Sequence, residues 1–374
     1  MKFVYLISIL LIQSACGWKH AESQTAEAGL DEGILLEAVE QIQNGRFGEI
    51  HSLLIYKNDM LAFEQYFEGH GFQWDAPGFY GDYISWDKEL PHAVHSVTKS
   101  ITSLCIGMAV EQGFIKDIRQ SIFDYLPEHS HLRTPGKDGI TIEHLLTMTS
   151  GLEWIEWGIS YHSPENPIIG IWYSDKDPVS FILEGELRHA PGTRYAYYGG
   201  NQILLGEILR NASGMPIDSF SQAYLFDPLG IEDATWASRF ENGVIEAAGG
   251  LRMRPRDMLK IGVLMLQGGR WEGRQIIPES WIGLSARPYG GNSSIRIPGE
   301  DWGRVGYAFG WWTRAIRVQA EASELYFALG WGGQKIIVLP GLDMVVVFTG
   351  ANYTSKVEEF RILEKFILPA IVSG

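Results

Sequence analysis

Strand-like segments lie at both ends of this 374-residue chain, and a mainly helical stretch separates them. Near the start, residues 51–56 and 61–67 are rich in strand-forming side chains and flank Lys57-Asn58-Asp59, which is a hairpin signal. Further strands are expected late in the chain, at residues 306–313, 325–329, 334–339 and 344–349. A single sheet must therefore be assembled from distant segments, and its hairpins predict a mostly antiparallel arrangement.

Helical periodicity predicts the elements that cover this sheet. Apolar residues repeat at helical spacing over residues 34–42 and 357–367, and residues 97–112 form the strongest amphipathic pattern, which stops at Gly113. Residues 115–265 read as helical segments separated by loops that contain Pro and Gly.

These patterns together predict an α+β fold. We expect one domain over residues 31–374, with a sheet lobe at about 31–114 and 266–374. A helical lobe at about 115–265 is inserted between its halves. The junction of the two lobes is a natural place for a cleft.

Composition and charge exclude some classes of partner. Hydrophobic residues make up 45% of the chain and charged residues 20%, values that are normal for a globular protein with a real core. The formal net charge is −15, which repels phosphate backbones. We therefore expect no nucleic-acid partner.

The first residues indicate export. Residues 3–12 are apolar apart from Ser8 and follow a positive start, whereas a membrane span needs about 20 apolar residues. We predict a signal peptide at residues 1–16 and a tether at residues 17–30. The small residues before Cys16 resemble a bacterial lipobox, although Gln13 stands where that motif has Leu.

This pattern favours a lipoprotein of the bacterial periplasm or cell envelope, held to the membrane only by a lipid on Cys16. The alternative is ordinary cleavage near Ala15 to Gly17, which would release the protein.

The pattern Ser-x-x-Lys occurs twice, where chance alone predicts about one match in a chain of this length. Ser85 and Lys88 precede Glu89-Leu90-Pro91 and read as a loop. Ser96, in contrast, opens the strongest amphipathic helix, with Lys99 three residues further on. The second match is therefore the candidate for chemistry.

Residues three apart share a helix face, so Lys99 can reach the Ser96 hydroxyl. A serine hydroxyl becomes a good nucleophile when a base removes its proton, and burial can lower the pKa of a lysine enough for that role. The free N–H groups at the helix start favour an oxyanion. The alternative is that Ser96 caps the helix and Lys99 is a solvated charge. For His95, neighbouring side chains point apart, which favours a role in positioning or packing.

The sequence around Ser96 resembles the first motif of the serine β-lactamase, penicillin-binding protein and esterase superfamily, especially its class C-like branch. Further landmarks follow in the family's order over roughly residues 34–368. They are Leu145-Leu-Thr-Met-Thr-Ser-Gly-Leu152, Pro191-Gly-Thr-Arg-Tyr-Ala-Tyr197, Leu204-Leu-Gly206, Gly249-Gly-Leu-Arg252, Tyr307-Ala-Phe-Gly-Trp-Trp312 and Gly330-Trp-Gly-Gly-Gln334. The resemblance implies a β-lactamase/transpeptidase-like fold with Ser96 as nucleophile.

The resemblance also implies roles for later residues. Tyr197 matches the tyrosine that shares general-base duty with the lysine, although a packed aromatic is the alternative reading. The backbone N–H groups of Ser96 and Trp331 would form an oxyanion hole. Six tryptophans could line an acyl pocket or pack the lobes together, and these are Trp154, Trp157, Trp172, Trp311, Trp312 and Trp331.

Two departures from the family pattern bear on the substrate. The second motif usually reads Tyr-x-Asn, but Gly199 stands in the Asn position here, so Asn201 is the candidate replacement for binding substrate. The cationic third motif is replaced by Ala328-Leu329-Gly330, where Gly330 is a candidate substrate contact. Because β-lactams carry a carboxylate that the cation helps to hold, the esterase and 6-aminohexanoate-dimer hydrolase branch is favoured.

The expected function is that of a serine hydrolase that cleaves an ester or amide bond of a small molecule through an acyl-enzyme. Glu128-His-Ser-His131 lacks metal-ligand spacing, so neither a metal nor another cofactor is expected. Two alternatives stay open. One is a peptidoglycan-directed D-alanyl carboxypeptidase or a β-lactamase, and the other is a non-catalytic tethered binding protein on the same scaffold.

Overall fold

A computed structural model describes residues 23–300, 302–318 and 321–372. The predicted signal peptide, Cys16 and residues 17–22 lie outside the described residues. Across the described ranges, none of the helices combines the length and the apolar character that a membrane span requires.

Seven strands form the main sheet in the order β10-β11-β12-β13-β14-β1-β2, and every neighbouring pair is antiparallel. The strands are β1 (Ile50–Lys57), β2 (Met60–Tyr66), β10 (Gly306–Tyr307), β11 (Trp312–Val318), β12 (Glu321–Gly330), β13 (Gln334–Leu339) and β14 (Met344–Gly350). The first strand pairs with the last, with Leu54 opposite Val347. The expected antiparallel sheet built from both ends of the chain is therefore confirmed.

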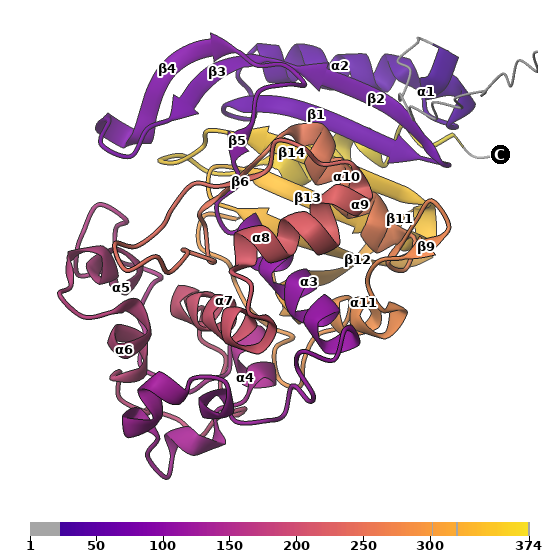
Figure 1. The fold of residues 1–374 in the computed structure, drawn as a ribbon. Coiled ribbons are helices and arrows are strands. Elements are labelled where there is room, and N and C mark those ends of the chain that lie inside the picture. Colours follow the sequence, from indigo (N-terminus) through magenta and orange to yellow (C-terminus); the bar gives the residue numbers. More distant parts are fainter. Residues whose placement is uncertain (1–22, 301, 319–320, 373–374) are drawn as a thin grey trace, which may run out of the picture.

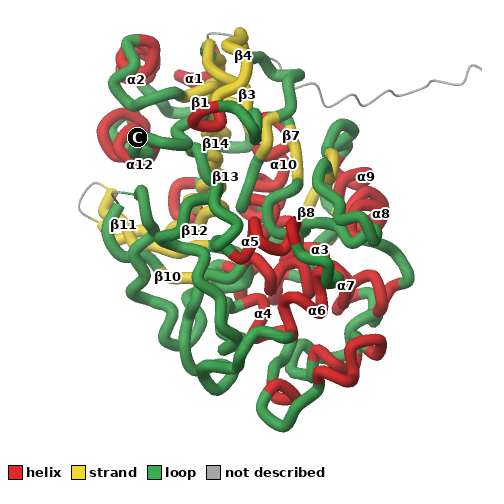
Figure 2. The backbone as a smooth tube through the Cα atoms, turned by 90° about the vertical axis from the view of Figure 1, so that its left-hand side faces the viewer, coloured by secondary structure: helices red, strands yellow, loops and turns green. Residues whose placement is uncertain are grey.

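Helices cover both faces of this sheet (Figure 2). On one side lie α3 (Val97–Glu111) and α10 (Pro255–Leu266), and on the other lie α2 (Glu32–Gln43), α12 (Glu359–Ile362) and the π turn η8 (Leu363–Ile367). Strands β1, β13 and β14 are buried along their whole length, which explains the apolar runs at residues 336–339 of β13 and 344–348 of β14.

The helical segments gather beside and below the sheet, from the centre to the lower left of Figure 1. They are α4 (Ile142–Leu146), α5 (Pro167–Gly170), α6 (Pro178–Leu183), α7 (Gly199–Ser213), α8 (Ile217–Ser221) and α9 (Asp227–Leu229). Helix α3 contacts both the sheet and α7, so it joins the two parts of the fold. Its first residue is Val97, which places Ser96 at the meeting point of sheet and helices.

Smaller elements complete the fold. The remaining α-helices are α1 (Ser23–Glu27) and α11 (Glu279–Ser285). The remaining strands form a ribbon of β3 (Glu68–Phe72) and β4 (Tyr80–Ser85), a small sheet of β5 (His92–Ala93), β7 (Leu251–Met253) and β6 (Thr235–Trp236), and a hairpin of β8 (Arg270–Trp271) and β9 (Arg274–Gln275).

The structure corrects the expected tether and one lobe boundary. Residues 23–30 belong to the fold, because α1 packs on β2, the Thr25 hydroxyl donates to the carbonyl of Ala62, and Leu30 is buried. Helix α10 was expected in the helical lobe, but it packs on β13 and β14. A Cβ at Gly262 would lie 2.4 Å from Val345, so only glycine allows this helix so close to the sheet.

Candidate active site

Ser96 and Lys99 meet as expected from their spacing. The Ser96 side chain makes no capping hydrogen bond to its helix, although Ser96 occupies the N-cap position of α3. Instead, the Lys99 amine lies 2.9 Å from the Ser96 hydroxyl oxygen and donates to it. Lys99 is only 4% exposed, so it is not the solvated surface charge of the alternative reading.

Lys99 has a second fixed partner and two acidic neighbours. Its amine donates to the carbonyl of Ala248 over 2.8 Å. Burial lowers the pKa of Lys99, while the charges of Glu156 and Glu246 oppose that change. A lowered pKa favours the neutral amine, which can accept the proton of the Ser96 hydroxyl.

Tyr197 comes to the same place from the loop before α7. The Lys99 amine lies 4.9 Å from the centre of the Tyr197 ring. Burial raises the pKa of Tyr197, the charge of Glu156 adds to the rise, and a hydrogen-bonding contact with Ser96 opposes it. The ring stacks on Trp157 at a centroid distance of 4.8 Å, which fixes its orientation.

Two cavities meet at Ser96. The first has a volume of about 480 Å³ and is lined by Lys99, Glu246 and a group of apolar side chains, Phe72, Trp74, Ile168, Ile169, Trp172 and Tyr173. The second has a volume of about 350 Å³ and is lined by Tyr197, Trp157, Trp312, Gly330 and Glu300. Ser96, Glu156, Tyr161 and Trp331 line both. Of the six tryptophans considered as pocket residues, Trp154 and Trp311 line neither.

The end of β12 lies against the segment that leads into α3. A Cβ at Gly330 would lie 2.2 Å from the carbonyl oxygen of Val94, so the two backbones pass in direct contact. This contact sets Gly330 and Trp331 beside Ser96, where the resemblance expects the second oxyanion donor.

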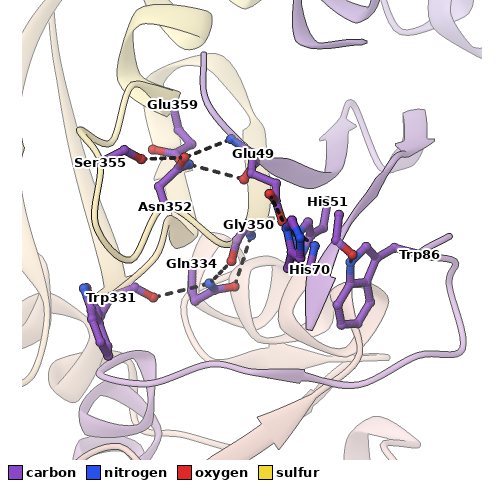
Figure 3. A network of polar contacts seen from close by, with 11 residues as sticks. Glu49, His51, His70, Trp86, Trp331, Gln334, Gly350, Asn352, Ser355 and Glu359 are labelled. Atoms are coloured by element: carbon purple, nitrogen blue, oxygen red, sulfur yellow. Dashed lines mark hydrogen bonds and ion pairs between the residues drawn. The ribbon is translucent and has the colours of Figure 1, made fainter. Parts of the chain in front are cut away.

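The Gln334 side chain of β13 and the backbone after β14 hold Trp331 in place (Figure 3). The Gln334 amide donates to the carbonyl of Trp331 over 3.3 Å and to the carbonyl of Gly350 over 2.6 Å. The Trp331 indole donates to the carbonyl of Tyr353 over 3.2 Å. The turn after β12 is therefore fixed from both of its sides.

His95 adopts a backbone φ of 46°, an unusual value for a residue other than glycine. Its ring packs edge-on against Phe72 and Trp331, with centroid distances of 4.7 Å and 5.5 Å. Burial, with the charges of Lys99 and Arg252, lowers the pKa of His95 to about 3. The His95 ring therefore packs next to Ser96, and packing is one of the two roles considered for His95.

Asn201 is not brought to the site. It is fully buried in α7, where its amide contacts the sulfur of Met148, and it lines neither cavity next to Ser96. The other Ser-x-x-Lys match is remote as well: Ser85 ends strand β4 rather than lying in a loop, and its hydroxyl donates to Glu68. Within the described ranges, no three His, Cys, Asp or Glu side chains are arranged to hold a metal ion.

The comparison with known proteins accounts for this arrangement. The profile of the family described as Beta-lactamase matches residues 52–362. The chain belongs to the beta-lactamase family. Among solved structures, the octameric penicillin-binding protein homologue from Pyrococcus abyssi superimposes with a TM-score of 0.65 at 18% identity, over 91% of this chain and 79% of that one. The fold expected from the resemblance is therefore confirmed.

Curated relatives match parts of the chain. A D-alanyl-D-alanine-carboxypeptidase/endopeptidase, AmpH of Escherichia coli (strain K12), is 29% identical over 143 residues, which cover 38% of this chain and 36% of the relative. The 6-aminohexanoate-dimer hydrolase of Paenarthrobacter ureafaciens is 24% identical over 265 residues, which cover 68% of this chain and 65% of the relative. The chain thus spans about a third of the length of the first relative.

Sequence reasoning missed the two buried carboxylates of the site. Glu156 accepts hydrogen bonds from the Trp154 indole over 2.9 Å and from the backbone N–H of Gly199 over 2.8 Å. Glu246 accepts from the backbone of its own loop. The available signal was their position, Glu156 between aromatic residues and Glu246 three residues before the landmark that begins at Gly249.

Proposed function

We propose that this protein is a serine hydrolase that cleaves an ester or amide bond of a small molecule through an acyl-enzyme. The observation that carries the proposal is the buried Lys99 amine, which lies 2.9 Å from the Ser96 hydroxyl oxygen with the Tyr197 ring beside it. Among the described residues, no carboxylate forms an ion pair with Lys99. Structural needs alone explain poorly why a buried lysine without such a partner is held against a serine hydroxyl.

The catalytic cycle follows from these groups. Lys99 takes the proton of Ser96 while the Ser96 oxygen bonds to the substrate carbonyl carbon, and the backbone N–H groups of Ser96 and Trp331 stabilise the oxyanion. The bond to the leaving group breaks as that group receives a proton through Tyr197. Water then attacks the acyl carbon, gives its proton to the same pair, and the acid leaves with Ser96 restored.

The charge of the two cavities favours neutral substrates. Among the described residues that line them, Lys99 is the sole lysine or arginine, whereas the carboxylates of Glu156 and Glu246 line the first cavity and that of Glu156 also lines the second. A substrate carboxylate would be repelled on either side of Ser96. This supports an ester or amide with an apolar acyl group rather than a β-lactam or a peptide with a free carboxyl end.

The test compares Ser96→Ala with Ser85→Ala, its matched control at the other Ser-x-x-Lys match. Purified protein should label with a fluorophosphonate probe and hydrolyse an activated short-chain ester. Ser96→Ala should abolish labelling and lower the rate by at least ~10⁴-fold, and Ser85→Ala should change neither. Equal labelling of Ser96→Ala and wild type would reject Ser96 as the nucleophile.

The same purified protein can be used to test the alternative functions. Rapid nitrocefin turnover with little ester hydrolysis would favour β-lactamase chemistry. Release of D-alanine from a peptide would favour the carboxypeptidase. Protein that neither labels nor turns over substrate, but binds an ester, would favour the binding protein.

We also propose that the chain is exported and carries a lipid at Cys16, which the apolar run before that residue supports. Expression of wild type and Cys16→Ser in bacteria, followed by fractionation, tests this. Wild type should enter the membrane fraction and Cys16→Ser should not. Equal distribution of both would contradict lipidation.

A further inference from the structure

The loop before β7 folds around the side chain of Glu246. One carboxylate oxygen accepts the backbone N–H of Ala248 over 2.8 Å, and the other accepts the N–H of Gly249 over 2.9 Å. The carboxylate is 7% exposed and lines the first cavity together with Ser96. It thus bends residues 246–249 into a fixed turn at the wall of the site.

One peptide unit connects this carboxylate with Lys99. The carbonyl of the Ala248–Gly249 peptide accepts the Lys99 amine over 2.8 Å, and the N–H of that same peptide donates to Glu246. A hydrogen bond to a carboxylate polarises the peptide and makes its carbonyl a stronger acceptor. Glu246 therefore acts on Lys99 through the peptide that lies between them.

Helix α3 holds the same loop at two further points. The Thr102 hydroxyl donates to the carbonyl of Ala247 over 2.8 Å, and the backbone N–H of Leu251 donates to Thr98 over 3.3 Å. These contacts fix the ends of the loop, but the orientation of the peptide between them depends on Glu246. The Ala248 carbonyl would lose that restraint if the carboxylate were removed.

We propose that Glu246 is a positioning residue that holds the Lys99 amine against the Ser96 hydroxyl through the Ala248–Gly249 peptide. The inference rests on the proposed function, because the position of Lys99 matters only if this amine takes the proton of Ser96. A substitution at Glu246 should change the chemical step more than the binding of substrate.

The charge of Glu246 should also affect how the reaction rate depends on pH. The groups that face Lys99 are Glu156, Glu246, Tyr197 and His95. Glu156 and Glu246 both raise the pKa of Lys99 against the effect of burial. Without the charge of Glu246, Lys99 would lose its proton at lower pH. The acidic limb of the pH–rate profile, which reports formation of the neutral amine, should then move to lower pH.

Glu246→Gln is the main variant, and Glu207→Gln is its control. Glu207 is equally buried but lies on α7, where it pairs with Arg210. For Glu246→Gln we expect kcat to fall about 10–100-fold with KM within about threefold, and the acidic limb to move down by about one pH unit. Glu207→Gln should match wild type. An unmoved limb with kcat within twofold of wild type would overturn the proposal.

Glu246→Asp carries the test if Glu246→Gln does not fold, as judged by thermal melting. It retains the charge but has a shorter reach, so kcat should fall about tenfold with the acidic limb in place. Unchanged kcat would overturn the proposal. Ser96→Ala distinguishes failure of the proposed function from failure of this inference. If Ser96→Ala remains active, the proposed function fails. If Ser96→Ala is inactive while the Glu246 variants behave as wild type, only the inference about Glu246 fails.

Discussion

Gly330→Ala should disable the site through a backbone collision. The added Cβ would lie 2.2 Å from the Val94 carbonyl oxygen, whereas real Cβ atoms are essentially never closer than 3.0 Å to a neighbour. Both partners are backbone, so the end of β12 must retreat by about 1 Å from the start of α3. A displacement of this size typically lowers the rate about 10²-fold, and the loss of one oxyanion donor typically lowers it about 10²–10³-fold.

We therefore expect kcat for an activated ester to fall about 10²–10³-fold, which corresponds to about 2.7–4 kcal/mol in the activation free energy. Overpacking should also lower the free energy of unfolding by about 1–3 kcal/mol. Gly283→Ala is the control, because a Cβ at that exposed position in α11 meets nothing within 4 Å. If Gly330→Ala folds and retains kcat within threefold of wild type, the close approach of β12 does not serve catalysis.

A buried ion cluster around Lys335 of β13 gives two further predictions. Lys335 contacts Glu359 at 2.8 Å and Glu300 at 3.1 Å, so Lys335→Met should lower the free energy of unfolding by about 3–5 kcal/mol in urea titrations; a loss below 1 kcal/mol would contradict this. Burial, against the charge of Lys335, raises the pKa of Glu300 from 4.5 to about 7. The folded chain then binds a proton more readily than the unfolded chain, so this group makes the free energy of unfolding fall as pH rises from about 4.5 to 7. Glu300→Gln should remove that part of the slope, and identical slopes would refute the assignment.

The proximity of Ser96 and Lys99, the proposed nucleophile and base, could be predicted because both lie at the start of one helix. Ser96 and Lys99 are three residues apart, so local geometry brings them together without knowledge of the fold. Tyr197 needed the resemblance, since a lone tyrosine among aromatics has no local signature. Glu156 and Glu246 escaped prediction because their role depends on loops that meet Lys99 only in the folded chain.

The same contrast holds for the fold. Strands β13 and β14 were predicted at nearly their observed bounds, and the apolar runs that they contain agree with burial of both of their faces. The ribbon of β3 and β4 was missed, since its residues are mostly half-buried or exposed and its sequence shows no clear alternation. The assignment of Asn201 to substrate binding depended on spacing alone. In the structure, its position along α7 places the Asn201 side chain in the core.

The pairing of β1 with β14 has a consequence for how the chain folds as it is synthesised. The amide of Glu49 donates to the side chain of Asn352, 303 residues further along the sequence. A growing chain therefore exposes one edge of the first hairpin until its last strand has been synthesised, and contacts of such long range slow folding. Gly330 and Trp331 also reach Ser96 only at that stage. A shortened chain that lacks β12 to β14 would accordingly be inert, however well its helices formed.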